Sequence, residues 1–240
     1  MLDKDNIYTK MQREFYDATA DIMAIDNHRG HDSSPDYYGI LLGDINQSWS
    51  KKSALDFGCG IGRNVDNLSK LADWTTVDGC DISSENIKRA NDFLKTVIPE
   101  NKFKLYTTTG VDLKPIGSDR YDFVMSTIVL QHIPVRSIRV SLMKDIYRVM
   151  KVGGLFSFQM AQYDRGQIGS ANYFDEVIEA SGTNGRYDVS VENPSDLIID
   201  LEEIGFSDIT YQIRPEWDAY AKTYVSSPHS RWIFVKAWKK

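Results

Sequence analysis

The sequence predicts an α/β fold built on a doubly wound, mostly parallel sheet with helices on both faces. Two observations carry this prediction. The stretch ALDFGCGIGRN, residues 54–64, joins a short apolar run to a glycine-rich turn, and residues at helical spacing follow it. A second apolar run, residues 75–81, ends in an acidic residue. Strands that alternate with helices in this way are typical of parallel sheets.

Length and composition favour a single domain that spans residues 1–240. A chain of 240 residues is long enough for one α/β domain with a full core, whereas two domains would be cramped. Hydrophobic residues at 42% and charged residues at 26% are ordinary for a soluble globular protein. The net charge of −6 argues against a nucleic-acid partner, because phosphate binding normally needs a basic face. No apolar run approaches the length of a membrane helix and the N-terminus lacks the apolar core of a signal peptide, so we expect a cytoplasmic protein that does not enter a membrane.

The N-terminal region, residues 1–50, is expected to form a helical cap. Apolar residues recur at three- and four-residue steps from about Ile7 to Ile25, which predicts a helix. After a polar loop, Pro35 is expected to begin a short amphipathic helix that runs to Ile45, because proline at the first helical position loses no hydrogen bond.

The polar loop between these two helices, residues 26–38, is rich in groups that can carry chemistry. His28 and His31 stand three residues apart among several aspartates. Imidazole and carboxylate groups can bind zinc or iron, but no helix fixes both histidines on one face, so we expect no metal. Two interpretations stay open: one of these histidines transfers a proton or contacts substrate, or the loop is simply solvated.

The glycine-rich turn is the predicted cofactor site. Gly58, Gly60 and Gly62 remove three Cβ atoms where the chain must bend sharply, so that a ligand can touch the backbone. The helix that follows presents N–H groups toward the same place. A Rossmann-like strand, turn and helix of this kind can hold a dinucleotide or S-adenosylmethionine. The dinucleotide pattern requires glycine at position 63, where this chain has Arg63, so S-adenosylmethionine is favoured.

Acidic residues near the ends of two strands support that choice. Asp56 lies two residues before the first glycine, close enough to orient the turn or to accept a hydrogen bond from a ligand's ammonium group. Asp81 ends the second strand, where its carboxylate can accept hydrogen bonds from two ribose hydroxyls. Asp78 is a rival, but side chains alternate along a strand and ligands lie beyond the carboxyl ends of such sheets. We therefore expect Asp81 to hold the ribose and its neighbour Ile82 to belong to the cofactor site.

Two further residues complete the predicted cofactor turn, namely Cys59 within it and Asn64 at the start of the following helix. Cys59 and Cys80 are the two cysteines of the chain, and the simplest interpretation is two buried thiols. A disulfide would need an oxidising compartment, which nothing else in the sequence indicates.

Four stretches, in the same order along the chain, resemble the class I S-adenosylmethionine-dependent methyltransferases, particularly the small-molecule branch that includes ubiquinone and natural-product methyltransferases. ALDFGCGIGRN is similar to the family's first motif and GCDISSENI to its acidic motif after the second strand. YDFVMSTIVLQHIP is similar to the fourth strand and its turn, and MKVGGLFSF to the approach to the fifth strand. The resemblance covers the chain from about Lys52 to its end. It implies a seven-stranded sheet with an antiparallel last strand, S-adenosylmethionine as methyl donor and S-adenosylhomocysteine as product.

The resemblance also implies roles for individual residues. In the family an acidic or amide side chain after the third strand meets the adenine amino group, and Val111 and Asp112 match that position. Thr127, at the end of the fourth strand, would line the methionine portion of the cofactor. His132 is either a general base or a structural hydrogen-bonding residue, and the structural role is favoured because family members with differing chemistry share it. The N-terminal helix would be a lid over cofactor and substrate, or would simply pack against the sheet.

The remaining elements follow from periodicity and from signals at helix ends. One long helix carries charges that are most simply a solvated face; they are Arg136, Arg139, Lys144 and Arg148. Segments 161–192 and 214–230 are expected to cover the substrate, and the aromatic residues of the second segment are candidates for a substrate wall or for a packed hairpin. The expected helices are 63–72, 83–97, 135–150 and 194–204, and the expected strands are 103–106, 121–127, 155–160, 208–213 and 231–238.

The sequence therefore predicts methyl transfer from S-adenosylmethionine to a small-molecule acceptor by in-line displacement. If the acceptor is an oxygen or a protonated amine, a proton must be removed, and the candidate catalytic residues are His132, His28, His31 and Tyr16. Two other functions stay open: an NAD(P)-dependent oxidoreductase, and a protein that binds S-adenosylmethionine without turning it over. A homodimer is one assembly that we consider.

Overall fold

The strands of the central sheet alternate with helices along most of the chain. The computed structural model describes residues 2–25, 34–43, 49–162, 170–174, 188–218, 220–227 and 231–240. Its main strands are β1 Ser53–Phe57, β2 Thr76–Asp81, β3 Leu105–Thr107, β4 Tyr121–Thr127, β5 Met150–Gln162, β8 Phe206–Pro215 and β11 Arg231–Lys239. Two small pairs join β6 Ser170–Asn172 to β7 Asp188–Ser190, and β9 Trp217–Asp218 to β10 Thr223–Tyr224.

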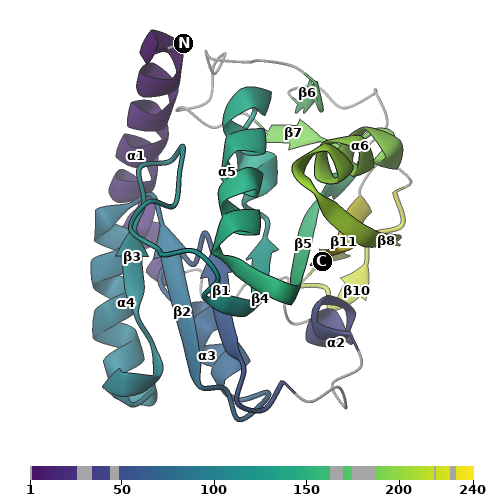
Figure 1. Ribbon diagram of the computed structural model, residues 1–240. Helices are drawn as coiled ribbons and strands as arrows, with labels where there is room; N and C mark the ends of the chain where they lie inside the picture. The colour runs from purple at the N-terminus through teal and green to yellow at the C-terminus, as the bar shows by residue number, and fades with distance from the viewer. Residues whose placement is uncertain are drawn as a thin grey trace.

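The seven main strands form one sheet in the order β3-β2-β1-β4-β5-β11-β8 (Figure 1). Neighbouring strands from β3 to β5 pair in parallel. The last strand, β11, is antiparallel to both of its neighbours, β5 and β8. The predicted mostly parallel sheet with an antiparallel last strand is therefore confirmed.

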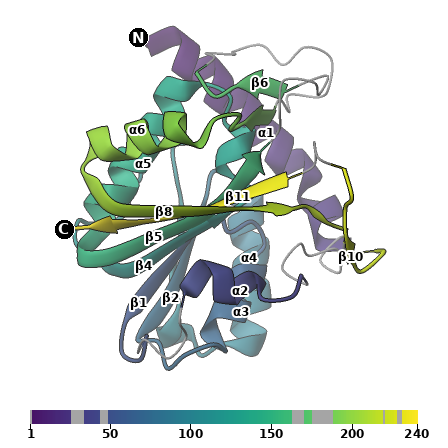
Figure 2. The same cartoon turned by 90° about the vertical axis from the view of Figure 1, so that its right-hand side faces the viewer.

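Helices cover both faces of this sheet. Figure 2 shows α5 and α6 on one face, and α2, α3 and α4 on the other. The long first helix, α1, lies beside α4 and crosses the end of the sheet where the parallel strands finish (Figure 1). The helices are α1 Leu2–Ile25, α2 Tyr37–Leu42, α3 Arg63–Ser69, α4 Ser84–Val97, α5 Arg136–Val149 and α6 Pro194–Ile204, with short 3-10 turns η3 Glu100–Lys102 and η4 Leu130–His132.

The ends of α4 and α6 follow the expected side-chain signals. The Ser83 hydroxyl accepts a hydrogen bond from the backbone N–H of Asn86 and so satisfies a helix terminus that has no partner within the helix. Helix α6 begins at Pro194 after the cap Asn193 and ends at Gly205, whose φ of 115° is one that glycine adopts without strain. The prediction for residues 194–204 is therefore confirmed.

Several predicted boundaries are wrong in informative ways. Helix α2 ends at Leu42 rather than Ile45, because Gly43 takes a φ of 75° and closes the last turn. Strand β5 starts at Met150 and includes the two glycines that were expected to precede it. In α1 the apolar residues Ile7 and Ile22 are exposed, and the helix buries a largely polar face instead.

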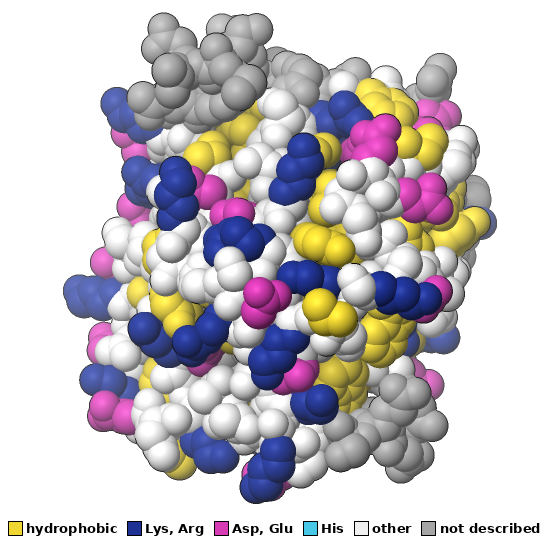
Figure 3. Space-filling view, in the orientation of Figure 1, with side chains coloured by type: hydrophobic (Ala, Val, Ile, Leu, Met, Phe, Trp, Pro, Cys, Tyr) yellow, Lys and Arg dark blue, Asp and Glu magenta, His cyan; other side chains and the backbone are white. Residues whose placement is uncertain are grey.

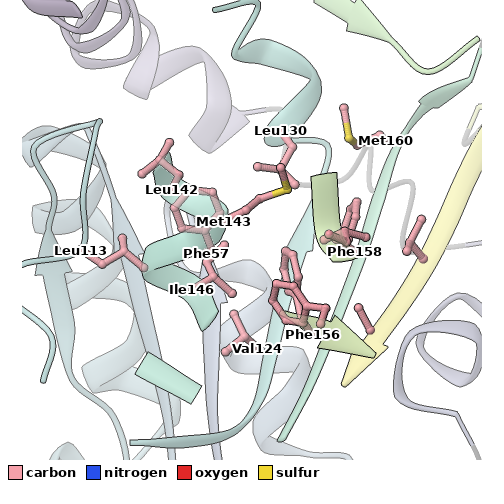
Figure 4. Packing of buried hydrophobic residues seen from close by; sticks show 14 of the residues in the cluster. Phe57, Leu113, Val124, Leu130, Leu142, Met143, Ile146, Phe156, Phe158 and Met160 are labelled. Carbon is pink, nitrogen blue, oxygen red and sulfur yellow. The ribbon is translucent and has the colours of Figure 1, made fainter. Parts of the chain in front are cut away.

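Apolar side chains pack into one cluster on each face of the sheet. On the α5 side the cluster reaches from β1 and β4 to the helix, and Figure 4 labels Phe57, Leu113, Val124, Leu130, Leu142, Met143, Ile146, Phe156, Phe158 and Met160. On the other face Trp74 stacks against both Trp49 and Phe123. The sheet is thus buried on both sides, as a doubly wound parallel sheet requires.

Two of the basic side chains predicted to form a solvated face on α5 pack against other parts of the protein instead. Arg139 is fully buried and donates hydrogen bonds to the backbone oxygens of Ile133 and Tyr173. Arg136 pairs with Asp200 of α6, and that carboxylate also accepts from the Tyr173 hydroxyl. The prediction was wrong for these residues because residues 170–174 pack over the side of α5 that carries them.

The described surface carries no wide area of one charge on the face in Figure 3, where basic and acidic side chains are interspersed. Among the described residues no helix is both long and apolar enough to cross a membrane.

Candidate functional site

A cavity of about 300 Å³ lies between the carboxyl ends of β1, β2 and β4 and the helix α1. This is the edge of a doubly wound sheet at which ligands bind. Its volume is at the lower end of the range for small-molecule sites. The lining residues are Tyr8, Gln12, Tyr16, Phe57, Gly58, Gly60, Arg63, Asp81, Ile82, Asn86, Thr108, Gly110, Thr127, Ile128, Val129, His132, Ile133 and Leu142.

The glycine turn forms the floor of the cavity. The backbone N–H groups of Gly58 and Cys59 both donate to the carbonyl oxygen of Cys80, at 2.8 and 2.9 Å, which joins the turn to the end of β2. A Cβ atom at Gly58 would lie 2.3 Å from the Val129 side chain, so only glycine permits this approach to the turn after β4. At Gly60, where φ is 50°, a Cβ atom would meet nothing within 4 Å. Its missing side chain leaves open space on the cavity side of the turn.

Asp81 connects the glycine turn to the start of α4. One carboxylate oxygen accepts from the backbone N–H of Gly60 and the other from that of Ser83, both at 2.9 Å. Burial raises the pKa of this carboxyl group, and the two backbone donors oppose that shift. Asp78 points the other way, where it accepts from the Tyr121 hydroxyl and the backbone N–H of Lys104. The predicted opposite orientation of the two aspartates is confirmed, and only Asp81 lines the cavity.

Asp56 lies beneath the cavity and does not line it. The side chain is fully buried, and in the part of the chain that the structure describes neither oxygen receives a hydrogen bond of ordinary geometry. Burial raises the pKa of Asp56 to about 7, although the nearby Arg63 guanidinium favours the charged form. Arg63 itself lines the cavity, so a guanidinium faces this end of it above the buried carboxyl group.

The two cysteines are free and buried beside the same turn. Burial raises the pKa of both thiols, and for Cys59 the neighbouring Asp81 adds to the shift. The interpretation as two buried thiols is confirmed. Cys59 and Gly62 belong to the turn but do not line the cavity, and Asn64 lies behind its wall, where it donates to Thr127.

Helix α1 closes the cavity from the opposite side. The Tyr8 hydroxyl donates to the backbone oxygen of His132, and Asp17 accepts from the hydroxyl of Ser83. Two of the predicted catalytic residues, Tyr16 and His132, both line the cavity. The sequence analysis missed Tyr8 and Gln12, although spacings of four and eight residues from Tyr16 place all three on one helix face.

The loop after β3 approaches the cavity through other residues than those predicted. Thr108 and Gly110 line it, whereas Val111 and Asp112 do not. The Asp112 carboxylate accepts from the Thr109 hydroxyl and pairs with Lys114, which lowers the pKa of Asp112 despite its partial burial. An adenine role for Val111 or Asp112 therefore stays a prediction that this arrangement does not favour.

The remaining predictions concern residues outside the described ranges and residues that do not line the cavity. His28 and His31 lie outside the described residues, as do most of segments 161–192 and part of 214–230. Within the described ranges no cluster of three or more His, Cys, Asp or Glu side chains could hold a metal ion. Trp217 packs into the core cluster opposite α5 and against Tyr224 across the small β9–β10 pair, away from the cavity.

Residues 55–158 match the family model described as a methyltransferase domain. These residues form a methyltransferase domain. They hold the glycine turn, Asp81, Thr127 and His132. The match thus favours methyl transfer over the oxidoreductase alternative. A search of curated proteins gave no match to the sequence.

Solved structures share the fold of the methyltransferase domain at low sequence identity. Phosphoethanolamine N-methyltransferase 2 of Haemonchus contortus, solved with phosphomonomethylethanolamine and S-adenosylhomocysteine, matches with a TM-score of 0.69 and 18% identity over 95% of this chain and 59% of that chain. Geranyl diphosphate C-methyltransferase from Streptomyces coelicolor matches with a TM-score of 0.61 and 12% identity over 83% and 76%. A methyltransferase from Methanosarcina mazei matches with a TM-score of 0.57 and 16% identity over 81% and 95%. The chain spans only 59% of the length of the Haemonchus protein.

Proposed function

We propose that this protein transfers a methyl group from S-adenosylmethionine to a small-molecule acceptor by in-line displacement. The observation that carries the proposal is the cavity at the carboxyl edge of the sheet. Gly60, with open space where a side chain would be, and the carboxylate of Asp81 both line it, and the two are joined by a hydrogen bond. Two of the proteins with a similar fold were solved with small molecules, phosphomonomethylethanolamine and geranyl diphosphate. Those acceptor classes support a small-molecule acceptor rather than a nucleic acid here.

In this proposal the cofactor lies across the ends of three strands. Asp81 would accept from the ribose hydroxyls, and Ile82, Thr108 and Gly110 would surround the adenine. The methionine portion would extend over Gly58 toward Thr127. Strands lie about 4.8 Å apart, so the ends of β2 and β4, two strands apart, are separated by about 10 Å, a distance that suits an extended nucleoside and amino acid.

The main catalytic requirement is alignment of the reacting atoms. The sulfonium is an activated methyl donor, so the protein must hold the acceptor atom, the methyl carbon and the sulfur in line, and no covalent enzyme intermediate is needed. If the acceptor must lose a proton, His132 and Tyr16 are the candidates that line the cavity. His28 and His31 stay candidates without a described position.

Two substitutions at matched glycines test the cofactor site. Gly60 and Gly153 both have positive φ and open space at the Cβ position, but only Gly60 lines the cavity. We expect Gly60→Ala and Gly153→Ala to lose similar stability, about 1 kcal/mol each, because both strain the backbone. Only Gly60→Ala, and separately Asp81→Ala, should weaken S-adenosylhomocysteine binding, by about tenfold or more. Isothermal titration calorimetry measures the affinity. Unchanged affinity in both Gly60→Ala and Asp81→Ala would overturn the assignment of the site.

Turnover separates an enzyme from a protein that only binds the cofactor. Release of S-adenosylhomocysteine is measured with a panel of small phosphorylated, hydroxylated and amine acceptors. We expect release that depends on one acceptor class. Tight binding with no release across the panel would favour the binding-only function.

The single domain, the homodimer and the absence of a nucleic-acid partner stay proposals. Measurements of molecular size in solution would test the first two, and measurements of nucleic-acid binding would test the third.

A further inference from the structure

A chain of side-chain hydrogen bonds runs from α2 and α3 to the wall of the cavity. The Asn67 amide nitrogen donates to the Tyr38 hydroxyl oxygen at 2.8 Å, and the Tyr38 hydroxyl donates to Asn64 Oδ1 at 2.9 Å. Asn64 Nδ2 then donates to Thr127 Oγ1 at 2.9 Å. Thr127 ends β4 and lines the cavity, whereas Asn64 and Tyr38 do not line it.

The donor-to-acceptor direction of these hydrogen bonds determines the role of the Thr127 hydroxyl. Because the Tyr38 hydroxyl gives its proton to Asn64, the Asn64 amide turns its oxygen toward Tyr38 and its N–H toward Thr127. Thr127 Oγ1 is therefore an acceptor in this bond, and its own proton remains to be donated. Among the described residues Thr127 makes no second side-chain hydrogen bond. Its proton is thus directed to whatever occupies the cavity.

The group that receives this proton must be an acceptor. On the proposed function, on which this step rests, the cofactor offers ribose hydroxyls near Asp81 and an amino-acid end near Thr127. A sulfonium has no affinity for a hydrogen-bond donor, and an ammonium group is itself a donor. The remaining strong acceptor at this end is the carboxylate, and the Arg63 guanidinium lines the same cavity.

We propose that the Thr127 hydroxyl donates to the carboxylate of the methionine portion of S-adenosylmethionine, and that Asn64 and Tyr38 are positioning residues for this bond. Tyr38 belongs to the N-terminal cap, in the helix α2. The cap therefore contributes to cofactor binding through the wall of the cavity as well as from above it. A hydroxyl that is already oriented needs no reorganisation when the anion arrives.

The test compares two ligands that differ only at the amino-acid end. S-adenosylhomocysteine carries the carboxylate, and 5′-deoxy-5′-methylthioadenosine lacks the whole amino-acid group. We expect Thr127→Val to weaken S-adenosylhomocysteine binding about tenfold, because a hydrogen bond to a charged group is lost, and to leave methylthioadenosine binding unchanged. Thr127→Ser keeps the hydroxyl and should bind both ligands within about twofold of the parent protein.

The positioning role has its own readout. We expect Tyr38→Phe to weaken S-adenosylhomocysteine binding about threefold, and the double variant with Thr127→Val to bind no more weakly than Thr127→Val alone, since both act on one bond. Tyr211→Phe, at an exposed tyrosine of β8, is the matched control and should have no effect.

Each failure has a distinct meaning. If Thr127→Val weakens both ligands equally, or neither, the carboxylate assignment is wrong. Additive losses in the double variant would overturn the positioning role. If the parent protein binds neither methylthioadenosine nor S-adenosylhomocysteine, the proposed function is wrong, rather than the role of Thr127 alone. Thermal unfolding of each variant identifies any loss that comes from misfolding. If Thr127→Val does not fold, Tyr38→Phe decides the question: the proposal fails unless this variant weakens S-adenosylhomocysteine binding and leaves methylthioadenosine binding unchanged.

Discussion

A carboxyl group under the glycine turn makes the stability of this protein depend on pH. Burial raises the pKa of Asp56 to about 7, from an ordinary value of 3.8. A group whose pKa is higher in the folded state contributes stability below its unfolded pKa and loses that contribution as pH rises through the folded value. Between about pH 4 and pH 7 the unfolded chain releases this proton while the folded protein keeps it.

We therefore expect Asp56→Asn to be more stable relative to the parent protein at pH 7.5 than at pH 5. About two pH units of this window, from pH 5 to pH 7, lie between the two conditions, and at about 1.4 kcal/mol each they give an upper bound of about 3 kcal/mol for the change in relative free energy of unfolding. Urea unfolding of the cofactor-free protein at the two pH values measures it. Glu14→Gln, an exposed substitution, is the control. Identical pH dependence in Asp56→Asn and the parent would show that Asp56 is not buried as an acid.

Sequence patterns identified the backbone part of the site better than the side chains that face a ligand. Gly58, Gly60 and Asp81 follow from local rules for tight turns and strand ends, and all three line the cavity. Asp112 could not be placed in this way, because its partner Lys114 stands two residues on and only the folded loop shows which neighbour the carboxylate faces.

Helix α5 shows the same limit for a whole element. Its bounds followed from periodicity to within one residue, but periodicity cannot tell a solvated charge from one that another segment covers. The Arg139 guanidinium lies 4.7 Å from the centre of the Tyr173 ring and holds residues 170–174 against α5. Its other hydrogen bond reaches Ile133, which lines the cavity.

We expect Arg139→Met to lower the melting temperature by about 10 °C, because backbone oxygens at two positions lose a buried charged donor, at a cost of roughly 3–5 kcal/mol. Burial lowers the pKa of Arg139, and its hydrogen-bonded surroundings keep the cation in place. Lys144→Met, on the exposed side of the same helix, is the control and should change little. Equal melting temperatures for the two variants would contradict a structural role for Arg139.

At the scale of the whole molecule, α1 connects the three loops that surround the cavity. It contacts the loop after β2 through Asp17, the loop after β3 through Arg13, and η4 through Tyr8. These contacts are polar, and the Arg89–Asp21 ion pair adds another. These polar contacts hold the helix over the cavity together with the buried side chains of Tyr8 and Ala20.

We expect Asp17→Ala to increase the rate at which S-adenosylhomocysteine dissociates, by about threefold or more, because the hydrogen bonds to Ser83 and Glu85 are lost. Stopped-flow fluorescence measures this rate. Glu14→Ala, on the same helix and paired only at 3.9 Å with Lys10, is the matched control. A dissociation rate that is equal in both variants would show that α1 does not retain the cofactor.

The order of strands was predictable because each βα unit carries its own turn and cap signals, and the sheet follows from their succession. The covering segments were not predictable in the same way. Contacts such as Tyr8 with His132 join residues more than a hundred positions apart, and no local pattern specifies them.

The two buried thiols beside the glycine turn have a practical consequence. A thiol-specific reagent reacts with the thiolate, so burial and a raised pKa protect Cys59 and Cys80 while the turn is closed. Labelling then proceeds only through transient opening of this region. The rate of thiol modification under native conditions therefore reports how often this region opens, and the measurement needs no introduced probe.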